Sequence, residues 1–416
     1  MRILIASDSF KGCFSSAEAA YLISAGVKKA LPDAVIDTVQ IADGGEGTAR
    51  VLSDALSGEV RRITVYGPAG NPVEALFSIL PGGEAIMDMA SASGLTLVPD
   101  GKRDIMAATT YGTGQLILAA LDAGCRRIYI GIGGSATNDG GIGMAEALGV
   151  RFYDSAGRVL GADYQAPQPS LLGAGEHVLQ PSLLGASDQV PQPSFLSAKD
   201  LSTIAKIDLS GLDQRLLSTG ISVLCDVKNP LCGPEGAAYT YGAQKGASSE
   251  NIEYLDKSLA HYARILERQT ELGLAGLDLA GLEGIGAAGG LGLSLIAFAG
   301  AKMIRGIDYV LDAAGFDEKA RAADLIVTGE GKIDAQSACG KAISGIAKRA
   351  TIFGVPIAAV CGSIDGDIRD VYAAGICAVE AAVCSPMTIS EALDNASENL
   401  TNAAERLIRA ISIGLR

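Results

Sequence analysis

Short apolar runs, each followed by a polar glycine-containing loop and then a helical pattern, recur along the chain. The first run is Ile3–Ala6, and a capping-box pattern at Ser15 and Glu18 predicts the helix that follows it. Further runs of this kind are Val35–Ile41, Arg127–Ile132, Leu325–Thr328 and Pro356–Cys361. Continuous apolar runs are typical of strands that are covered on both faces, as in a parallel sheet. The pattern therefore predicts an α/β fold with a Rossmann-like parallel sheet.

A second pattern interrupts the first. The strand-like segments Arg62–Tyr66, Val73–Leu80 and Glu84–Met89 follow one another through Gly-Pro and Pro-Gly-Gly turns that leave no room for helices. They predict an antiparallel or mixed sheet. Since 416 residues suffice for two domains, we expect two α/β domains. Residues 1–60 and 290–416 form the Rossmann-like one, and residues 61–289 form an inserted domain with the mixed sheet.

Composition excludes several classes of protein. The 33 basic and 47 acidic residues give a net charge of −14 without a basic run, which disfavours nucleic acid as a partner. The longest apolar stretch, Leu291–Ala301, is far shorter than the roughly 18 residues of a membrane span, and the N-terminus reads as a strand rather than a signal sequence. The eight scattered cysteines form no CxxC pair and are interpreted as reduced core cysteines of a cytoplasmic protein.

A twelve-residue tandem repeat lies near the middle of the chain. Residues 169–180 are followed by a near-copy at 181–192 and by a truncated third copy. Because so few short copies rich in Pro, Gly and Gln cannot build a solenoid, we interpret residues from about 165 to 198 as a duplicated surface insertion. His177 is replaced by Gln189 in the second copy, and we assign it no role.

Four loops combine glycine with acidic residues at positions where strands are expected to end. They are SDSFKG at 7–12, DGGEGT at 43–48, GIGGSATNDGG at 131–141 and TGEGKID at 328–334. Each acid alone is explained by helix capping. Together the loops favour phosphoryl transfer, because glycine and Ser, Thr or Asn side chains cradle phosphates while carboxylates bind Mg²⁺ or accept a hydroxyl proton. With only two histidines in the chain, a carboxylate is the expected base.

A dinucleotide-binding domain is the competing interpretation. Gly131–Ala136 follows a strand and matches GxGxxA, and Asp154 ends the next strand about 20 residues later. Against it, residues 137–141 are polar and glycine-rich where a helix should pack closely on the sheet. A second match, Gly284–Gly289, has no strand before it, and no GxxxxGK[ST] motif is present, so a P-loop kinase is not indicated.

Seven longer motifs carry a resemblance to a known family. They are DSFKG at 8–12, ADGGEGT at 42–48, TTYGTGQLI at 109–117, GIGGSATNDGG at 131–141, DVKNPLCGPEGAA at 226–238, GAAGGLG at 286–292 and TGEGKID at 328–334. In this order they resemble the bacterial glycerate kinase family that makes 2-phosphoglycerate, over nearly the whole chain. The chain departs from the usual pattern at Lys332, where the family commonly has Arg. Lysine keeps the positive charge of arginine but lacks its bidentate pair of N–H donors.

The resemblance implies ATP- and Mg²⁺-dependent phosphorylation of D-glycerate by two α/β domains with the active site in the cleft between them. The catalytic candidates are Asp43, as the first choice of base, with Asp8 and Lys11. The substrate-binding candidates are Ser9, Arg50 and Arg103. The phosphate- or nucleotide-binding candidates are Gly133, Gly134, Ser135, Thr137, Asn138, Asp139, Gly289 and Gly290. The metal-binding candidates are Glu330 and Asp334.

Several alternatives stay open at this stage. The two hydroxyls of glycerate fit one small pocket, so residue chemistry does not decide between the 2-phosphate and the 3-phosphate. Arg50, Arg103 and Lys11 are alternative partners for the glycerate carboxylate. A non-catalytic small-anion sensor is the alternative outside enzyme function, although acidic loops repel an anion unless a metal lies between them. The sequence leaves the oligomeric state undetermined.

Overall fold

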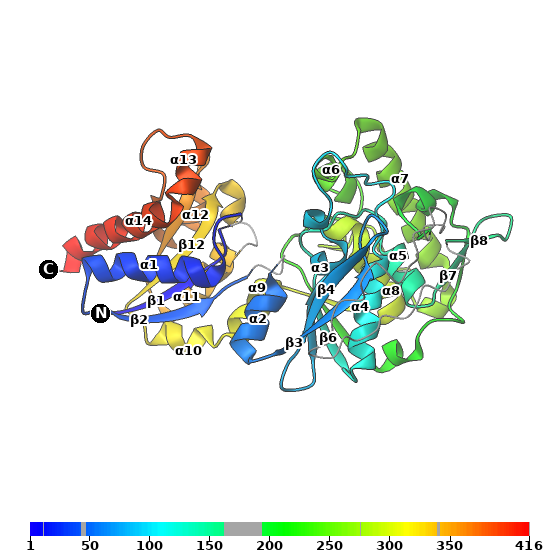
Figure 1. Ribbon diagram of the computed structural model, residues 1–416, viewed down its shortest axis with the longest axis horizontal. Helices are drawn as coiled ribbons and strands as arrows, with labels where there is room; N and C mark the ends of the chain where they lie inside the picture. Colours follow the sequence, from blue (N-terminus) through cyan, green and yellow to red (C-terminus); the bar gives the residue numbers. More distant parts are fainter. Residues whose placement is uncertain (11, 43–46, 162–193, 275, 339–341, 416) are drawn as a thin grey trace, which may run out of the picture. The chain divides into compact units, whose positions relative to one another are not determined.

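A computed structural model describes residues 1–10, 12–42, 47–161, 194–274, 276–338 and 342–415 (Figure 1). The chain divides into two compact units. Unit 1 comprises Met1–Gly44, Asp54–Leu56 and Arg305–Arg416, and unit 2 comprises Gly45–Ser53 and Ser57–Ile304. Helix α2 (Thr48–Leu56) contributes residues to both.

The second boundary lies later in the chain than the expected position at residue 290. Strand β11 (Lys302–Ile304) pairs in parallel with β10 (Gly220–Leu224), and helix α8 (Leu291–Ala299) packs against α5 (Ile142–Ala147). These contacts hold residues 290–304 in unit 2. The apolar sequence of α8 does not show which sheet it covers, so the boundary could not be read from it.

Unit 1 is built on a five-stranded parallel sheet in the order β14-β13-β12-β1-β2. Its strands are β1 (Arg2–Ser7), β2 (Val35–Gln40), β12 (Leu325–Ile333), β13 (Ile357–Ile364) and β14 (Ile376–Ala381). Its helices are α1 (Ser16–Ala30), α9 (Gly306–Ala313), α10 (Phe316–Arg321), α11 (Ala342–Phe353), α12 (Arg369–Ala373), α13 (Ile389–Asp394) and α14 (Ala396–Ile411). The predicted Rossmann-like sheet is therefore confirmed.

Apolar residues on both faces of this sheet explain its continuous hydrophobic strands. Ile3 and Ile5 pack on the side of α1 and α14, which lie together over the sheet, whereas Leu4 and Ala6 belong to the cluster beneath α9, α10 and α11 (Figure 1). The predicted capping box is present. The Ser15 hydroxyl accepts from the Glu18 N–H at 3.3 Å, and the Glu18 carboxylate accepts from the Ser15 N–H at 2.8 Å.

Unit 2 contains a six-stranded mixed sheet in the order β11-β10-β6-β5-β4-β3. Its other strands are β3 (Glu59–Tyr66), β4 (Pro72–Ile79), β5 (Ala85–Asp88) and β6 (Arg127–Gly131), and a small antiparallel sheet holds β7 (Arg151–Tyr153), β8 (Val159–Leu160) and β9 (Lys206–Asp208). Its other helices are α3 (Ala90–Ser93), α4 (Tyr111–Asp122), α6 (Ala237–Tyr241) and α7 (Ser249–Arg268). As predicted, β3, β4 and β5 pair antiparallel, and β5 then pairs in parallel with β6.

The structure corrects the prediction that residues 328–334 form a loop. Strand β12 runs on to Ile333, because β13 also continues and pairs with it as far as Ile364. Glycines allow this pairing. A Cβ atom on Gly362 would lie 2.4 Å from the Gly331 carbonyl oxygen. The low strand propensity of Thr-Gly-Glu-Gly-Lys is overridden here by the neighbouring strand.

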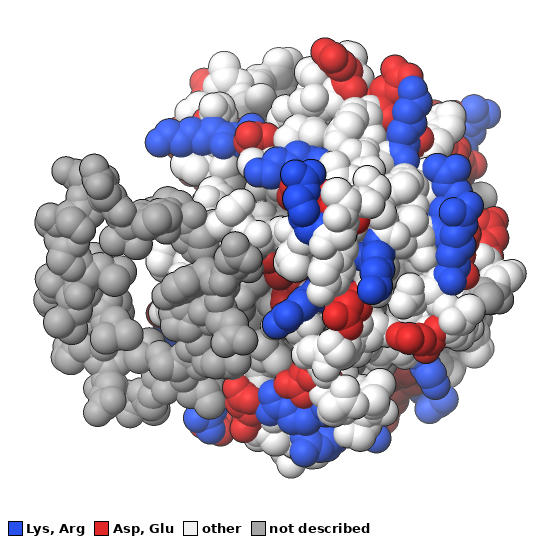
Figure 2. Space-filling model, turned by 90° about the vertical axis from the view of Figure 1, so that its right-hand side faces the viewer, with Lys and Arg blue, Asp and Glu red and all other residues white. Residues whose placement is uncertain are grey.

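Other sequence expectations have mixed outcomes. All seven described cysteines are free thiols, but only Cys125 and Cys361 are buried, and Cys377 and Cys384 are exposed, so the interpretation of all eight as core residues is wrong. Most of the repeat insertion lies outside the described residues. Within the described part of the chain, no helix is long and apolar enough to span a membrane. On the face shown in Figure 2, basic side chains lie among acidic and uncharged ones.

Candidate active site

Asp8 lies at the carboxyl end of β1, where the motif analysis places it. Ser7 is aligned with Gly329 of β12, and the Asp8 N–H donates to the Gly329 carbonyl at 2.9 Å. Asp8 is 7% exposed, and its carboxylate accepts from the Ser9 N–H at 2.7 Å. The structure therefore brings Asp8 and Ser9 next to the segment that carries Glu330, which follows Gly329 directly.

Glu330 and Asp334 are tied together through one serine. The Ser337 hydroxyl donates to the buried Glu330 carboxylate and accepts from the Asp334 N–H at 3.2 Å. Lys332, in the position where Arg is common, lies 3.1 Å from the Asp334 carboxylate and 3.2 Å from that of Asp365, and these partners raise its pKa. Lys332 thus lies between the carboxylates of Asp334 and Asp365 at the end of β12.

The donor set at this edge is compatible with one mode of Mg²⁺ binding. Among the described residues no group of three or more His, Cys, Asp or Glu side chains is spaced to hold a metal. Kinases nevertheless bind Mg²⁺ with one or two carboxylates, the substrate phosphates and water completing its shell. The neighbouring Glu330 and Asp334 fit that mode, and a protein-only cage is not indicated.

Lys11 and Asp43 lie outside the described residues, so the structure neither places nor removes them. Arg50 is exposed on α2. The start of that helix is held by Asp88, whose carboxylate accepts from the Gly47 and Ala49 N–H groups at 2.9 and 3.1 Å. Asp88 carries no motif signal, and its role at this helix terminus is structural.

In unit 2 the loop after β6 is fixed by its backbone. Gly134 has a φ of +76°, and its carbonyl accepts from the Leu95 N–H at 2.8 Å. The Ala136 N–H donates to the Ser93 carbonyl at 2.9 Å. These backbone bonds shape the turn that contains Gly133 and Gly134. The groups of this loop that could bind a ligand are therefore the side chains of residues 135–139.

Asp139 organises this loop from inside. It is fully buried, and its carboxylate accepts from the Thr110 N–H and hydroxyl at 2.9 and 2.7 Å, from the Gly141 N–H at 3.1 Å and from the Gly143 N–H at 3.4 Å. Burial raises the pKa of Asp139, while these donors act to lower it. With its oxygens engaged by these donors, Asp139 positions the loop, and its contact with phosphate stays a prediction.

Gly289 and Gly290 form the wall against which this loop packs. Their φ values are +64° and +85°, and the Gly289 carbonyl accepts from the Gly140 N–H at 2.9 Å. A Cβ atom on Gly289 would lie only 2.2 Å from the Thr137 carbonyl oxygen. Ala288 next to them also has a positive φ, of 52°, which costs energy for a residue with a side chain. The backbone of this wall approaches residues 137–140 as only glycine permits.

We expect Gly289→Ala to lower the free energy of unfolding by about 2 to 4 kcal/mol, because the left-handed backbone and the clash with Thr137 both add cost. Gly273→Ala is a matched control: Gly273 has nearly the same φ, +65°, but nothing lies within 4 Å of a Cβ there. The control should lose only about 1 kcal/mol. Urea unfolding of both variants measures the difference, and equal losses would contradict the proposed close packing.

Lys245 is the functional candidate that the sequence analysis missed. It ends a short 3₁₀ helix, Ala243–Lys245, and is 2% exposed. Its ammonium donates to the Ser135 hydroxyl and to the Thr137 carbonyl, both at 2.7 Å. Burial lowers the pKa of Lys245 to about 7, although the nearby Asp139 acts in the opposite direction. A buried lysine is rare, and here it is bound to the loop assigned to phosphates.

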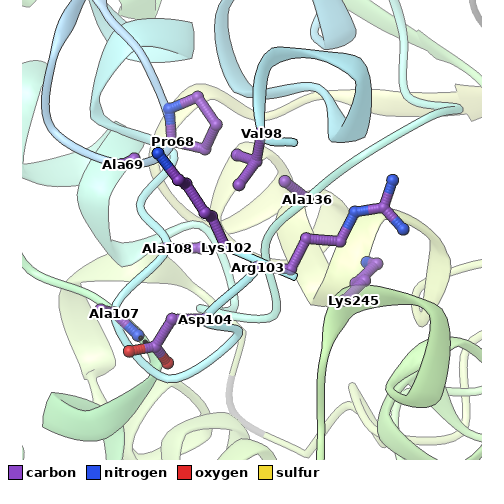
Figure 3. Close-up of a pocket in the computed structure, with 10 residues that line it drawn as sticks. All are labelled: Pro68, Ala69, Val98, Lys102, Arg103, Asp104, Ala107, Ala108, Ala136 and Lys245. Carbon is purple, nitrogen blue, oxygen red and sulfur yellow. Dashed lines mark hydrogen bonds between the residues drawn. The ribbon is translucent and has the colours of Figure 1, made fainter. Parts of the chain in front are cut away.

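A hollow opens beside Lys245, entirely within unit 2 (Figure 3). It is lined by Pro68, Ala69, Val98, Lys102, Arg103, Asp104, Ala107, Ala108, Ala136 and Lys245. Figure 3 shows Arg103 and Lys245 at one end and Asp104 at the other. Arg103, a candidate for the substrate carboxylate, therefore lies at the hollow, whereas Arg50 does not line it.

Two side chains of the loop carry buried polar atoms without a hydrogen-bond partner among the described residues. They are the Thr137 hydroxyl and both polar atoms of the Asn138 amide, and both residues are 0% exposed. Leaving such atoms unpaired costs roughly 1 to 3 kcal/mol each. Polar groups with no structural partner next to a cationic hollow are typical of a site whose ligand supplies the missing bonds.

The dinucleotide interpretation does not agree with the geometry. A dinucleotide fingerprint needs a helix that begins within the glycine motif, but α5 begins only at Ile142, after a ten-residue connection from Gly131. Asp154 follows β7, and β7 pairs with β8 and β9 in the small sheet. The strand before Asp154 is therefore not the neighbour of β6 that the dinucleotide interpretation requires. The Asp154 carboxylate accepts from the Ala156 and Arg158 N–H groups in a tight turn.

Comparisons with known proteins agree with the motif resemblance. The model of the glycerate kinase family matches residues 3–168 and 182–412. Residues 169–181, about one copy of the repeat, lie between the two matched stretches. The second and third copies fall within the matched part.

The similar proteins cover the chain from end to end. It is 42% identical to the glycerate kinase of Bacillus subtilis over 99% of this chain and 98% of that protein. It is 40% identical to the glycerate 2-kinase of Escherichia coli over 100% of this chain and 99% of that protein. A crystal structure described as "putative glycerate kinase 2" from Salmonella typhimurium LT2 is 39% identical, with a TM-score of 0.76 over 100% of this chain and 99% of that one.

Proposed function

Because the chain belongs to the glycerate kinase family, we propose that it transfers the γ-phosphoryl group of ATP to the 2-hydroxyl of D-glycerate. The enzyme is a kinase, and the product, 2-phospho-D-glycerate, is the finer part of the proposal. The observation that supports it best is the juxtaposition of the 135–139 loop with a hollow bordered by Arg103 and Lys245. We further propose that units 1 and 2 are its two domains.

The acceptor hydroxyl requires a base. Asp43 is the first candidate, on its ADGGEGT motif, and Asp8 is the second, on its place at the end of β1. The carboxylate orients the 2-hydroxyl and accepts its proton as the oxygen–phosphorus bond forms and the bond to the ADP oxygen breaks. Only modest basicity is needed, because a loose phosphoryl transition state depends mainly on positioning and charge neutralisation.

The other motif residues would bind the phosphates of ATP and the Mg²⁺ that accompanies them. Ser135, Thr137 and Asn138 would bind phosphate oxygens, with Asp139 and the glycines at 289 and 290 fixing their positions. Glu330 and Asp334 would hold Mg²⁺, which offsets phosphate charge when bound. Lys11 adds a positive charge in the mechanism that we propose. In this arrangement main-chain shape and fixed charges supply most of the rate.

An ADP-release assay with purified protein, ATP, Mg²⁺ and D-glycerate tests the kinase activity. We expect ADP formation that depends on both D-glycerate and Mg²⁺. L-glycerate and glycerol serve as acceptor controls. Binding of glycerate that does not require Mg²⁺, without any ADP, would instead favour the non-catalytic sensor. A change in NADH fluorescence on adding the protein would revive the dehydrogenase.

A further inference from the structure

The hollow in unit 2 has the dimensions of a site for a small ligand. It encloses about 130 Å³, well below the roughly 300 Å³ at which pockets for larger organic ligands begin. Six of its ten lining residues are apolar, namely Pro68, Ala69, Val98 and three further alanines, and the other four are charged. A hollow of this size suits a three-carbon acid better than a nucleoside triphosphate.

Its charged groups favour an anion. Among the residues that line it, the cations Lys102, Arg103 and Lys245 outnumber the one acid, Asp104, which Figure 3 shows at the end away from Arg103 and Lys245. Two acids outside the lining, Asp100 and Asp139, act on Arg103 and Lys245 respectively. This local excess of cations stands out in a chain whose net charge is −14. Fixed cations in a partly enclosed hollow attract a small anion more strongly than the same groups on an open surface.

Lys245 has a donor to spare. An ammonium group has three N–H donors, and the structure shows two acceptors for Lys245, the Ser135 hydroxyl and the Thr137 carbonyl. The side chain also lines the hollow. Among the described residues the ammonium has no third acceptor, so its remaining donor is available to an anion there. The lysine would then link that anion to the loop proposed to hold phosphates.

Arg103 is held in place by the segment that carries Lys245. One guanidinium nitrogen donates to the Gln244 carbonyl at 3.1 Å, and another forms an ion pair with Asp100. Its Nε atom is buried and has no partner among the described residues. A Cβ atom on Gly246 would lie 2.6 Å from the Arg103 carbonyl oxygen, so residues 244–246 pack directly on this arginine. Arg103 and Lys245 therefore form one preorganised cationic pair.

We propose that this hollow binds the carboxylate of D-glycerate through Arg103 and Lys245. A carboxylate matches the planar donors of arginine, and the small apolar wall accommodates the short carbon chain. This inference rests on the proposed function, for which it selects Arg103 among the alternative carboxylate partners and adds Lys245. The ligand that competes for the same chemistry is a phosphate of ATP, and the test separates the two.

Steady-state kinetics of full-length variants provide the test. Lys245→Met and Arg103→Gln should each raise the KM for D-glycerate roughly 10- to 100-fold, the range for loss of a charged hydrogen bond. Arg103→Gln should change the KM for ATP less than twofold. Lys245→Met also removes the bonds to Ser135 and Thr137, so it should raise the KM for ATP too, but by a smaller factor than the KM for D-glycerate. Arg103→Lys should lie between wild type and Arg103→Gln, because it keeps the charge but loses the fork. Lys199→Met, which alters an exposed lysine of unit 2 outside the hollow, should match wild type.

Each outcome decides the matter. A rise in the KM for ATP with an unchanged KM for D-glycerate assigns the hollow to a phosphate and overturns the proposal. Calorimetric titration of D-glycerate without ATP keeps the two proposals separate. One outcome is that the wild-type protein binds D-glycerate, that the variants do not bind it, and that no ADP forms. This outcome supports the carboxylate site and contradicts the kinase function. If wild type turns over and folded variants keep their KM, the site fails alone.

The pH dependence of KM gives a second readout. With its pKa near 7 through burial, Lys245 loses its proton as the pH rises, and with it the charge that attracts the carboxylate. Asp139 opposes this loss, and Arg103, Lys102 and Asp104 are the other charged groups at the hollow. The wild-type KM for D-glycerate should rise by up to about tenfold per pH unit between pH 7 and 9. It should stay flat for Lys245→Met, and a flat wild-type profile would contradict a role for the ammonium.

Discussion

Asp43→Asn is expected to lower kcat by about 10²- to 10⁴-fold, the usual contribution of a positioned general base. The amide has nearly the shape of the carboxylate but cannot accept the proton of the glycerate 2-hydroxyl. Since the substitution removes a proton acceptor and adds no bulk, we expect the KM for D-glycerate and the unfolding midpoint to change little. Steady-state kinetics together with thermal unfolding measure these effects.

Asp8→Asn is the matched comparison for this prediction. Asp8 stands at the end of β1 and accepts from the Ser9 N–H. Its amide variant should therefore lose activity mainly through altered positioning, and kcat should fall less than in Asp43→Asn. Nearly normal turnover of Asp43→Asn would remove Asp43 from the role of base. A larger loss in Asp8→Asn would then transfer that role to Asp8.

Asp139→Asn is expected to lower the free energy of unfolding by about 2 to 4 kcal/mol and to abolish most activity. Four donors point at the two oxygens of Asp139, and an amide offers one oxygen only. Whichever way the amide turns, at least one buried N–H loses its acceptor and faces an NH₂ group, at a cost of about 1 to 3 kcal/mol per unpaired group. Lys245 also loses a nearby negative charge.

Urea unfolding and ADP release measure the two parts of this prediction. Asp122→Asn is the control: Asp122 pairs with Arg215 on the surface of the same unit at 2.7 Å, and loss of an exposed pair costs only about 0.2 to 1 kcal/mol. A stable Asp139→Asn enzyme that lacks activity would indicate that Asp139 contacts the substrate. A stable and active one would contradict its role in the loop.

Local patterns predicted the framework well because local chemistry determines it. The capping box at Ser15 and Glu18 is formed by residues three apart, and the apolar runs of β1, β6 and β13 are strands whatever surrounds them. The motif segments after β1 and β6 likewise follow strands, as expected for the carboxyl ends of parallel strands, whereas TGEGKID lies largely within β12. These features placed Asp8, Ser135 and Asp139 near their observed positions.

Other features depend on contacts between distant segments. In the sequence Lys245 belongs to a polar Ala-Gln-Lys stretch, and it becomes a buried residue only because residues 135 and 137 supply its acceptors. The strand character of Glu330 depends on pairing with β13. Neither has a periodic signal of its own. Lys245 is followed by Gly246. Because lysine followed by glycine is a common pattern in turns, it could not indicate a functional site here.

The central claim is tested most directly by the identity of the phosphorylated product. The enzyme is incubated with ATP, Mg²⁺ and D-glycerate, and the product is passed to enolase and pyruvate kinase without phosphoglycerate mutase. We predict that enolase consumes the product at once, which requires 2-phosphoglycerate. A product that enolase consumes only after mutase is added would be 3-phosphoglycerate and would contradict the assigned position of transfer. The absence of any D-glycerate-dependent ADP would contradict the kinase assignment itself.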